Sequence, residues 1–504
     1  MPALISVPNT TFRNSALFTF LVFVISFACL LTLSFQRFVA FDEGFYLLAG
    51  KMVAEGNLPY LDFFYPQMPL LPFLHAVWIR LLGPDWYVAR IVTVLFASGT
   101  FALLFLYLQR TTTLSLALLA WLLIISQTEV LAWFTVAKTY AYSSLPLMLC
   151  TVLTLFATEK RGDRWRVQCF LAAGLSLGVT IDIRLFYVIL IPVFLLFILL
   201  KSERRFQSVL AFCAGGSIAA LPHLYFAAQD FDSYWFNNVG YHLVRSHRSP
   251  EVDHWSKWNI FLIVSGLKGS SRIDGLGLPL LVWGNFLLCL SSLATRRFPP
   301  LPTLLGLALF AMYFLPDPVH VQYFSTCVPL FVFGLILGLQ GYRFGRSALL
   351  FLLILSLLSL PSGLDRLIHS GEGLKGIDQE TKNLFTLKKI SEKSGLLDSS
   401  FPSGSIVISQ WPGFLFATTL QPAAGLENQF WIRMDKKLSD EQVMKYKLMT
   451  TKILKDLPSQ PEIRGIVIEE RKLKRYTSPA LLKKEGFVLS SKTDGLLIYD
   501  NPQR

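Results

Sequence analysis

Long apolar stretches separated by short polar segments dominate the first 361 residues of the chain. A helix needs about 20 apolar residues to cross a bilayer core of ~30 Å. The pattern therefore predicts an α-helical polytopic membrane protein with about eleven spans, of which the shorter ones are ambiguous. The runs read as spans are residues 16–35, 87–108, 113–127, 140–157, 167–181, 185–200, 207–226, 276–294, 301–315, 321–340 and 347–361.

The first apolar run follows a single arginine, Arg13, and extends from Ala16 to Phe35. It is longer than the apolar core of a signal peptide, and no A-x-A cleavage pattern follows it. We expect a retained first span with its N-terminus in the cytoplasm.

Basic residues in the short loops fall on one side of the membrane if every run spans it. The positive-inside rule makes that side cytoplasmic. The opposite, extracytoplasmic side then receives three large segments, at about 36–86, 227–275 and after 361, and sites are expected there because loops on a rigid scaffold carry function. The clusters are Arg110, then Lys160, Arg161, Arg164 and Arg166, then Lys201, Arg204 and Arg205, then Arg296 and Arg297, then Arg343 and Arg346.

The first large loop is not polar throughout. Residues 42–53 and 69–82 both carry apolar side chains at helical spacing. Such segments are typical of helices that lie in the membrane interface. The loop 36–86 is therefore predicted to contain interfacial helices.

The C-terminal part changes to a charged composition. Residues 405–409, 465–468 and 496–499 are β-branched or apolar runs that predict strands, and helical patterns occur near 378–396 and 438–457. The chain is thus predicted to divide into a transmembrane domain, 1–361, and a small extracytoplasmic α/β domain, 362–504.

Composition narrows the function classes. The chain is 53% hydrophobic and carries a net charge of +13. Much of the positive charge lies in the loops that orient the spans, so the charge does not indicate nucleic-acid binding. The six cysteines lie in or beside apolar runs, where they are typical of small buried side chains and not of disulfides or a metal site.

An acidic pair, Asp42-Glu43, follows the first span directly. Ionisable residues close to a membrane are costly and often functional. An alternative from the residues alone is that Asp42 caps the following helix, with Glu43 favouring its positive end.

The residues around this pair form a recognisable pattern. Asp42-Glu43 is followed by Tyr46, then by Gly56, Pro59-Tyr60 and Asp62, then by the turn Pro66-Gln67-Met68-Pro69-Leu70-Leu71, and by Arg90 in the next span. This first loop resembles that of the GT-C glycosyltransferase superfamily, in the branch of the protein O-mannosyltransferases and aminoarabinose transferases (glycosyltransferase family 39-like). The segment VISQWPGFLFATTLQPAAGLENQF in the C-terminal part resembles the extracytoplasmic domain of such enzymes.

The resemblance implies a hexosyl- or pentosyltransferase. Such an enzyme moves a sugar from a polyprenyl-phosphate-linked donor to an extracytoplasmic lipid, glycan or protein, and the acceptor here is unknown. Asp42 would be the catalytic acidic residue and would act as the general base, with Glu43 beside it. A carboxylate in reach of the acceptor hydroxyl suits that chemistry because the hydroxyl pKa is very high. The candidate substrate-binding residues of this loop are Tyr46, Tyr60, Asp62 and Gln67, although a turn role after Pro59-Tyr60 explains Asp62 better than substrate binding does.

Two departures from the family pattern concern phosphate and metal binding. Gln67 stands where aminoarabinose transferases have a lysine, and the next outer loop offers Glu129 and Lys138 where the family has a second acid. A divalent cation held by Asp42 and Glu129 is possible, but hard cations prefer several carboxylate oxygens. Lys138 could contact the phosphate instead, and no cofactor is certain.

Further phosphate-binding candidates are basic residues on the same side of the spans. Arg184 suits bidentate phosphate binding, although an ion pair with Asp182 is an alternative. His320 and Tyr323 match a basic residue and a tyrosine of the family pattern. Arg245 and Arg248 are candidates that could equally face solvent or lipid headgroups.

Two other functions remain open from the sequence. A transporter or flippase of lipid-linked substrates would show internal repeats and charges at mid-membrane, but here the spans carry few charges. A non-catalytic scaffold is the third possibility. The expected location is a bacterial inner membrane, with membrane lipids and a polyprenyl-phosphate donor as partners.

Overall fold

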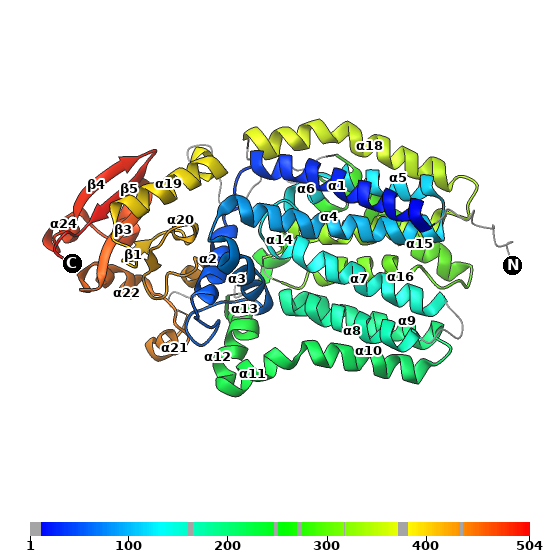
Figure 1. Cartoon of the computed structure of the whole chain (residues 1–504), viewed down its shortest axis with the longest axis horizontal. Helices are drawn as coiled ribbons and strands as arrows, with labels where there is room; N and C mark the ends of the chain where they lie inside the picture. The colour runs from blue at the N-terminus through cyan, green and yellow to red at the C-terminus, as the bar shows by residue number, and fades with distance from the viewer. Residues whose placement is uncertain are drawn as a thin grey trace. The chain divides into compact units, whose positions relative to one another are not determined.

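The computed structural model describes residues 12–159, 165–245, 250–269, 275–316, 318–370, 382–433 and 437–504. The chain forms two compact units. The helical unit comprises Met1–Phe35, Arg90–Leu221 and Arg248–Gly373, and the mixed unit comprises Gln36–Ala89, Pro222–His247 and Leu374–Arg504. Figure 1 labels the elements of both.

The helical unit is built from long apolar helices. Its main helices are α1 (Phe12–Gln36), α4 (Trp86–Thr111), α5 (Leu114–Ile125), α6 (Thr128–Trp133), α7 (Thr139–Glu159), α8 (Arg166–Ile183), α9 (Leu190–Lys201), α10 (Arg205–Ala219), α14 (Pro250–Val264), α15 (Gly277–Ala294), α16 (Leu301–Met312), α17 (Cys327–Leu339) and α18 (Gly345–Asp365). Their exposed faces are rich in large apolar side chains, as a lipid environment requires.

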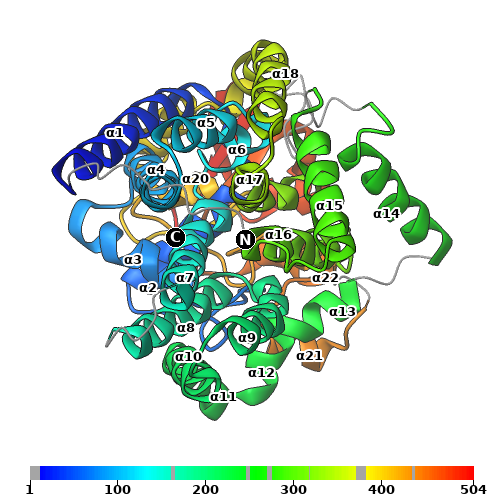
Figure 2. The ribbon, with the colours of Figure 1, turned by 90° about the vertical axis from the view of Figure 1, so that its right-hand side faces the viewer.

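Small residues allow close packing of these helices. Figure 2 shows α7, α8 and α10 side by side. A methyl group at Gly174 of α8 would lie 1.8 Å from the carbonyl oxygen of Phe212 in α10, and one at Gly215 would lie 2.0 Å from that of Leu171. Only glycine permits this approach, which is the usual basis of helix association in membranes.

The predicted spans are all helical, but their number is not confirmed. Among the described residues, seven helices are long and apolar enough to cross a membrane, or eight if α10 and α11 (Leu221–Gln229) form one bent span. The helical segments at the predicted runs 113–127, 185–200 and 301–315 are shorter, so the expected count of about eleven stays a prediction. The fold class, an α-helical membrane protein with a small C-terminal α/β part, is confirmed.

The mixed unit contains the first loop and the C-terminal part. Its helices are α2 (Glu43–Ala54), α3 (Leu70–Leu82), α11, α12 (Phe231–Trp235), α13 (Tyr241–Arg245), α19 (Leu387–Ser400), α20 (Gly413–Phe416), α21 (Asp440–Lys445), α22 (Thr451–Asp456), α23 (Leu473–Tyr476) and α24 (Pro479–Lys484). The predicted interfacial helices thus exist as α2 and α3, and their depth in the membrane stays a prediction.

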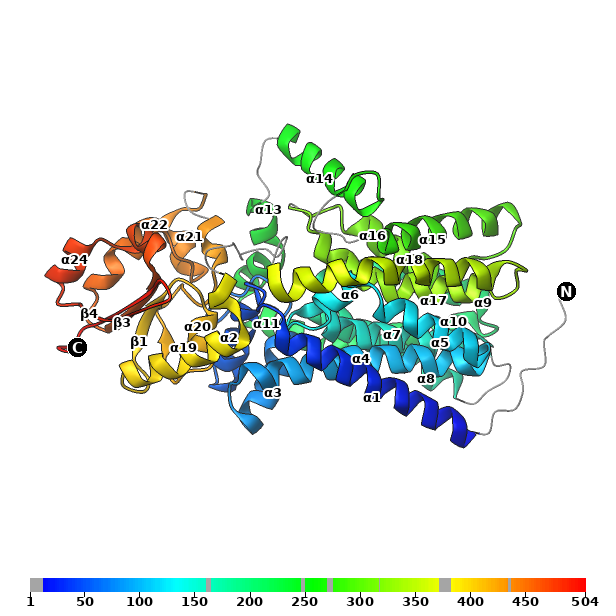
Figure 3. The ribbon, with the colours of Figure 1, turned by 90° about the horizontal axis from the view of Figure 1, so that it is seen from above.

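A five-stranded sheet with the order β2-β1-β3-β5-β4 forms the centre of the C-terminal part (Figure 3). The strands are β1 (Ile406–Ser409), β2 (Gln421–Pro422), β3 (Ile463–Glu469), β4 (Val488–Thr493) and β5 (Leu496–Asp500). β1 pairs in parallel with β2 and β3, and β5 pairs antiparallel with β3 and β4. Alternate residues of β3 and β5, such as Ile466, Ile468 and Leu497, are buried in the core beneath the sheet.

The three predicted strands are β1, β3 and β5, whereas two strands were missed. β2 has only two residues, and β4 is largely exposed and polar, so neither carries a strand-like apolar pattern. The helical pattern at 438–457 forms two short helices, α21 and α22, instead of one. The pattern at 378–396 corresponds to α19 from Leu387, and residues 378–381 lie outside the described residues.

Candidate active site

Asp42 and Glu43 have different surroundings, although they are neighbours in the sequence. Glu43 is the first residue of α2 and is fully buried, and its Oε1 accepts a hydrogen bond from the backbone N–H of Ala40 at 2.6 Å. Asp42 occupies the N-cap position, but its side chain makes no capping hydrogen bond to the helix. The side chain of Asp42 therefore does not cap α2, and Glu43 instead stabilises the turn before the helix through Ala40.

The half-buried carboxylate of Asp42 contacts the C-terminal part of the chain. Its Oδ1 accepts a hydrogen bond from Nε2 of Gln429 at 3.3 Å. Gln429 lies in the LENQF segment that follows β2. A hydrogen-bond donor that faces a carboxylate favours its ionised form. The contact joins Asp42 to the C-terminal part.

The turn that carries Asp42 packs closely on residues of the C-terminal part. Nε1 of Trp411 donates to the carbonyl oxygen of Phe41 at 2.7 Å, and the N–H of Val39 donates to that of Phe385 at 2.6 Å. A methyl group at Gly44 would lie 2.6 Å from the backbone nitrogen of Gly413. Glycine at position 44 is therefore required for this approach of α2 to α20.

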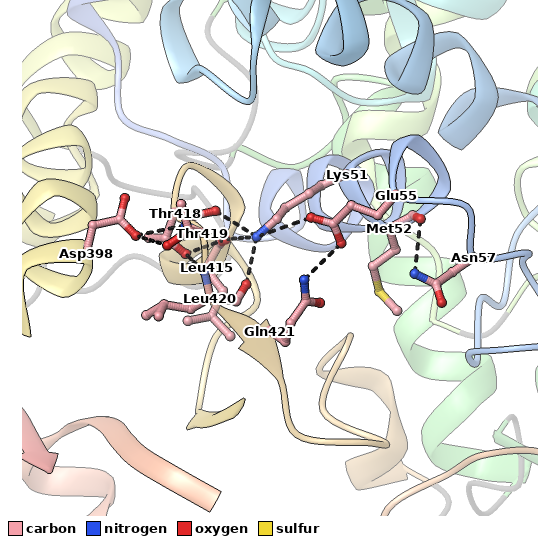
Figure 4. A network of polar contacts seen from close by, with 10 residues as sticks. All are labelled: Lys51, Met52, Glu55, Asn57, Asp398, Leu415, Thr418, Thr419, Leu420 and Gln421. Carbon is pink, nitrogen blue, oxygen red and sulfur yellow. Dashed lines mark hydrogen bonds and ion pairs between the residues drawn. The ribbon is translucent and has the colours of Figure 1, made fainter. Parts of the chain in front are cut away.

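Lys51 joins the far end of α2 to the same segment (Figure 4). The residue is only 3% exposed, and its Nζ donates to the carbonyl oxygens of Leu415, Thr418 and Leu420 at 3.2, 2.8 and 2.7 Å. Burial lowers the pKa of Lys51, while the Glu55 carboxylate 3.9 Å away opposes that effect. An ammonium group suits a site of three carbonyl oxygens because it donates three hydrogen bonds.

The other candidates in the first loop take part mostly in the loop's own structure. Tyr60 is buried with a left-handed φ of 71°, and its hydroxyl donates to the carbonyl oxygen of Gln67 at 2.7 Å. Asp62 is exposed and accepts from the N–H of Leu58 at 2.7 Å, which is the contact of a turn residue. Tyr46 is buried against the ring of Phe45, with 4.0 Å between centroids. Substrate roles for these residues stay predictions.

Residues 222–245 also pack against the first loop. Oδ1 of Asn237 accepts from the N–H of Tyr65 at 2.8 Å, and the ring of Tyr241 packs on Phe64 with 5.2 Å between centroids. The guanidinium of Arg245 lies 5.6 Å from the centre of the Tyr241 ring. Arg248 lies outside the described residues, so only the first of this predicted pair is placed.

A second group of candidates gathers within the helical unit. The guanidinium of Arg184 is buried among aromatic rings, 4.4 Å from the ring centre of Tyr323 and 5.2 Å from that of Tyr140. Lys138 is buried too, with Nζ 5.7 Å from the same Tyr140 ring, and the ring of His320 lies edge-on to Tyr323 at 5.4 Å. The structure thus brings Lys138, Arg184, His320 and Tyr323 into one cluster. Aromatic faces attract cations, so the rings stabilise these buried positive charges, and Nη1 of Arg184 also donates to Oγ1 of Thr139 at 3.4 Å.

Arg90, the last residue of the pattern noted in the sequence, has a structural contact in the helical unit. Its Nη1 donates to the carbonyl oxygens of Ser34 and Thr135 at 3.1 and 2.7 Å. It therefore connects the end of α1 to the segment after α6.

A metal site is not evident in the described part of the chain. No group of three or more His, Cys, Asp or Glu side chains there could hold a metal ion. Glu129 is buried and its Oε2 accepts from Oγ1 of Thr128 at 3.4 Å. The two-carboxylate metal site with Asp42 stays a hypothesis.

Sequence reasoning missed Lys51, Glu427 and Gln429. Lys51 offered a weak signal, since it is a single charge within an otherwise apolar helical run, 44–54. The segment containing Glu427 and Gln429 was noted only for its family likeness. Their proximity to the first loop depends on contacts across more than 360 positions of the chain, as the pairing of Gln429 with Asp42 illustrates, with a separation of 387.

Known proteins resemble this chain in part of the sequence and in the whole fold. Residues 65–226 match the family model of the dolichyl-phosphate-mannose-protein mannosyltransferases. The crystal structure of ArnT from Cupriavidus metallidurans in the apo state has a TM-score of 0.65 at 12% identity, covering 96% of this chain and 98% of that one. ArnT bound to undecaprenyl phosphate has a TM-score of 0.61 at 14% identity, with the same coverage. No curated protein sequence matches the chain.

These similarities agree with the expectation from the first loop. The resemblance to the GT-C superfamily, in the mannosyltransferase and ArnT-like branch, is confirmed by the family model and the fold.

Proposed function

We propose that this GT-C-type integral membrane protein transfers a sugar from a polyprenyl-phosphate donor to an extracytoplasmic acceptor, with Asp42 as the general base. The observation that carries the proposal is the contrast within the acidic pair. Glu43 accepts from the N–H of Ala40 in the turn before α2, whereas Asp42 makes no capping bond and its Oδ1 accepts from Nε2 of Gln429. The undecaprenyl phosphate bound to ArnT, which shares the fold, supports a polyprenyl-phosphate donor.

The reaction step follows from this assignment. An acceptor hydroxyl attacks the anomeric carbon of the donor sugar, and its proton passes to the Asp42 carboxylate. The bond between the anomeric carbon and the phosphate oxygen breaks, and polyprenyl phosphate leaves. We assign Arg184 and Lys138 to the phosphate, because developing negative charge on a leaving phosphate needs fixed positive groups.

The proposed orientation has the N-terminus in the cytoplasm and the C-terminal part outside, in a bacterial inner membrane. It rests on the distribution of basic loops. Reporters fused after Arg346 and after Arg504 test it, and a cytoplasmic signal from the second fusion would contradict it.

Asp42→Asn tests the catalytic assignment with little change of shape. The purified protein in lipid nanodiscs is assayed with polyprenyl-phosphate-linked hexoses and pentoses and with lipid, glycan and peptide acceptors. We expect Asp42→Asn to lower kcat by about 10²–10⁴-fold, the usual contribution of a general base. Glu43→Gln keeps an oxygen for the Ala40 N–H and should lose less than about tenfold in kcat.

Two outcomes would overturn the proposal. One is wild-type transfer by a folded Asp42→Asn variant. The other is movement of donor lipid across sealed vesicles by the wild type without release of polyprenyl phosphate, which would favour a flippase.

A further inference from the structure

Gln429 has one half of its amide group engaged and the other half unused. Its Nε2 donates to Asp42 at 3.3 Å, while its Oε1 is buried and has no hydrogen-bond partner in the part of the chain that the structure describes. The orientation of the amide follows from chemistry, because an ionised carboxylate only accepts hydrogen bonds. The nitrogen must therefore face Asp42, and the oxygen is left as a buried acceptor.

The segment around Gln429 is held firmly by its neighbours. Nδ2 of Asn428 donates to the carbonyl oxygen of Phe64 at 2.7 Å, and Oδ1 of Asn428 accepts from the N–H of Phe430 at 2.9 Å. The ring of Phe430 packs edge-on against Phe45 in α2, with 4.8 Å between centroids. The unused acceptor is thus built into a fixed segment beside the acidic pair.

A second buried side-chain oxygen without a partner lies two residues earlier. Glu427 is 7% exposed, and its Oε2 also has no partner among the described residues. A buried polar atom without a partner costs free energy, and native structures contain few of them, so each calls for a reason such as a bound ligand, a water or a functional role. Of these two buried oxygens, that of Gln429 belongs to the side chain that contacts Asp42, so it is the one the transfer site could use.

We propose that Gln429 belongs to the transfer site, where its amide nitrogen positions Asp42 and its carbonyl oxygen receives a hydroxyl group of the substrate. This inference rests on the proposed function and deepens it, since it makes the C-terminal part a contributor to substrate binding. The hydroxyl belongs either to the donor sugar or to a hydroxylated acceptor, and kinetics distinguish the two.

Three variants separate the roles of the two amide atoms. Gln429→Leu removes both the amide nitrogen and the amide oxygen. Gln429→Glu keeps an acceptor oxygen but replaces the N–H donor with a carboxylate that faces the carboxylate of Asp42. Gln421→Leu is the matched control, because Gln421 pairs with another carboxylate of the first loop, Glu55, at 3.1 Å on an exposed edge (Figure 4).

Steady-state transfer in nanodiscs is measured against donor and acceptor concentration and against pH. We expect Gln429→Leu to lower kcat/KM by about 10–100-fold, the usual effect of losing a hydrogen bond to a charged group. A raised KM for only one substrate identifies the source of the hydroxyl. Gln429→Glu should move the acid limb of the pH profile to higher pH, because a neighbouring negative charge opposes ionisation of the base. Gln421→Leu should match the wild type in all of these.

Labelling of Asp42 by a water-soluble carbodiimide and an amine supplies a readout that needs no transfer. The reagent attacks protonated carboxyl groups, so Gln429→Leu should label Asp42 several-fold faster at a given pH than the wild type or Gln421→Leu. If the wild type transfers no sugar, the proposed function fails, and so does the assignment of Gln429 to a substrate hydroxyl. The labelling experiment still tests whether Gln429 positions Asp42. Labelling and kinetics of Gln429→Leu equal to those of Gln421→Leu would overturn the inference.

Discussion

At the scale of single residues, Glu427 shows how burial changes an ordinary carboxyl group. Its Oε1 accepts from the N–H of Gly425 at 3.0 Å, and its Oε2 is buried without a hydrogen-bond partner among the described residues. Burial raises the pKa of Glu427 from 4.5 to about 7, against smaller opposing contributions from backbone N–H groups and from Lys447. The group therefore changes its charge close to neutral pH.

This pKa makes stability depend on pH in a defined direction. Between pH 4.5 and about 7 the folded chain holds a proton on Glu427 that the unfolded chain has lost, so the free energy of unfolding falls as pH rises through that window. Glu427→Gln removes the effect. We expect the variant to be more stable than the wild type above pH 7, by up to about 3 kcal/mol, and the difference to shrink below pH 4.5. Thermal unfolding from pH 4 to 8.5 measures it, and parallel curves for the two proteins would refute the prediction.

At the scale of elements, α2 depends on the C-terminal part for its position. The helix begins with Glu43, next to Asp42, and its single lysine donates to three carbonyl oxygens around the end of α20. The oxygen of Leu415 also accepts from Oγ1 of Thr418 at 2.9 Å, whereas Thr418 and Leu420 lie beyond the last residue of α20, where Lys51 supplies a donor. The contact therefore stabilises the end of α20 and holds α2 in position.

Lys51→Met tests this contact while keeping most of the apolar volume of the side chain. We expect a loss of about 2–4 kcal/mol in the free energy of unfolding, because buried carbonyl oxygens lose a charged donor. Transfer should fall as well, since Asp42 is carried at the start of the same helix. Denaturant unfolding in detergent measures the first effect. The control is Lys388→Met in α19, an exposed lysine 4.0 Å from Glu392, which should leave stability unchanged. Equal midpoints for the two variants would show that the buried contact contributes little.

At the scale of the whole molecule, the mixed unit is assembled from three separate stretches of chain. Residues 36–89, 222–247 and 374–504 share one set of contacts. The core beneath the sheet includes Phe64, Phe236 and Tyr241 beside residues of the C-terminal part. Trp411 stacks on Trp86, with 5.9 Å between ring centroids. The C-terminal part therefore completes its core with side chains from elsewhere in the chain.

A fragment of residues 374–504 should consequently be unstable alone. Without the first loop it would expose Trp411 and the apolar side chains of α20, and large exposed apolar surface favours association. We expect the isolated fragment to bind a hydrophobic dye and to lack the cooperative thermal transition of the full protein. A monomeric fragment that unfolds cooperatively at the full-length midpoint would refute the expectation.

The sequence by itself determined the membrane class, the helical runs, three of the five strands and the acidic pair. These features are local, because apolar periodicity and charge position express the burial of a segment without reference to its neighbours. A local pattern does not determine the number of spans, because short apolar helices satisfy it whether or not they cross the membrane.

Only the tertiary structure decided that Glu43 accepts a hydrogen bond in the turn before α2 and that Asp42 accepts one from Gln429. It also brought Lys138, Arg184, His320 and Tyr323 around shared aromatic rings. Hydrogen bonds such as those of Lys51 and Gln429 join residues more than 360 positions apart, and no local pattern encodes such a pairing. The position of the acid can be read from the chain, but its surroundings exist only once the first loop and the C-terminal part have folded together.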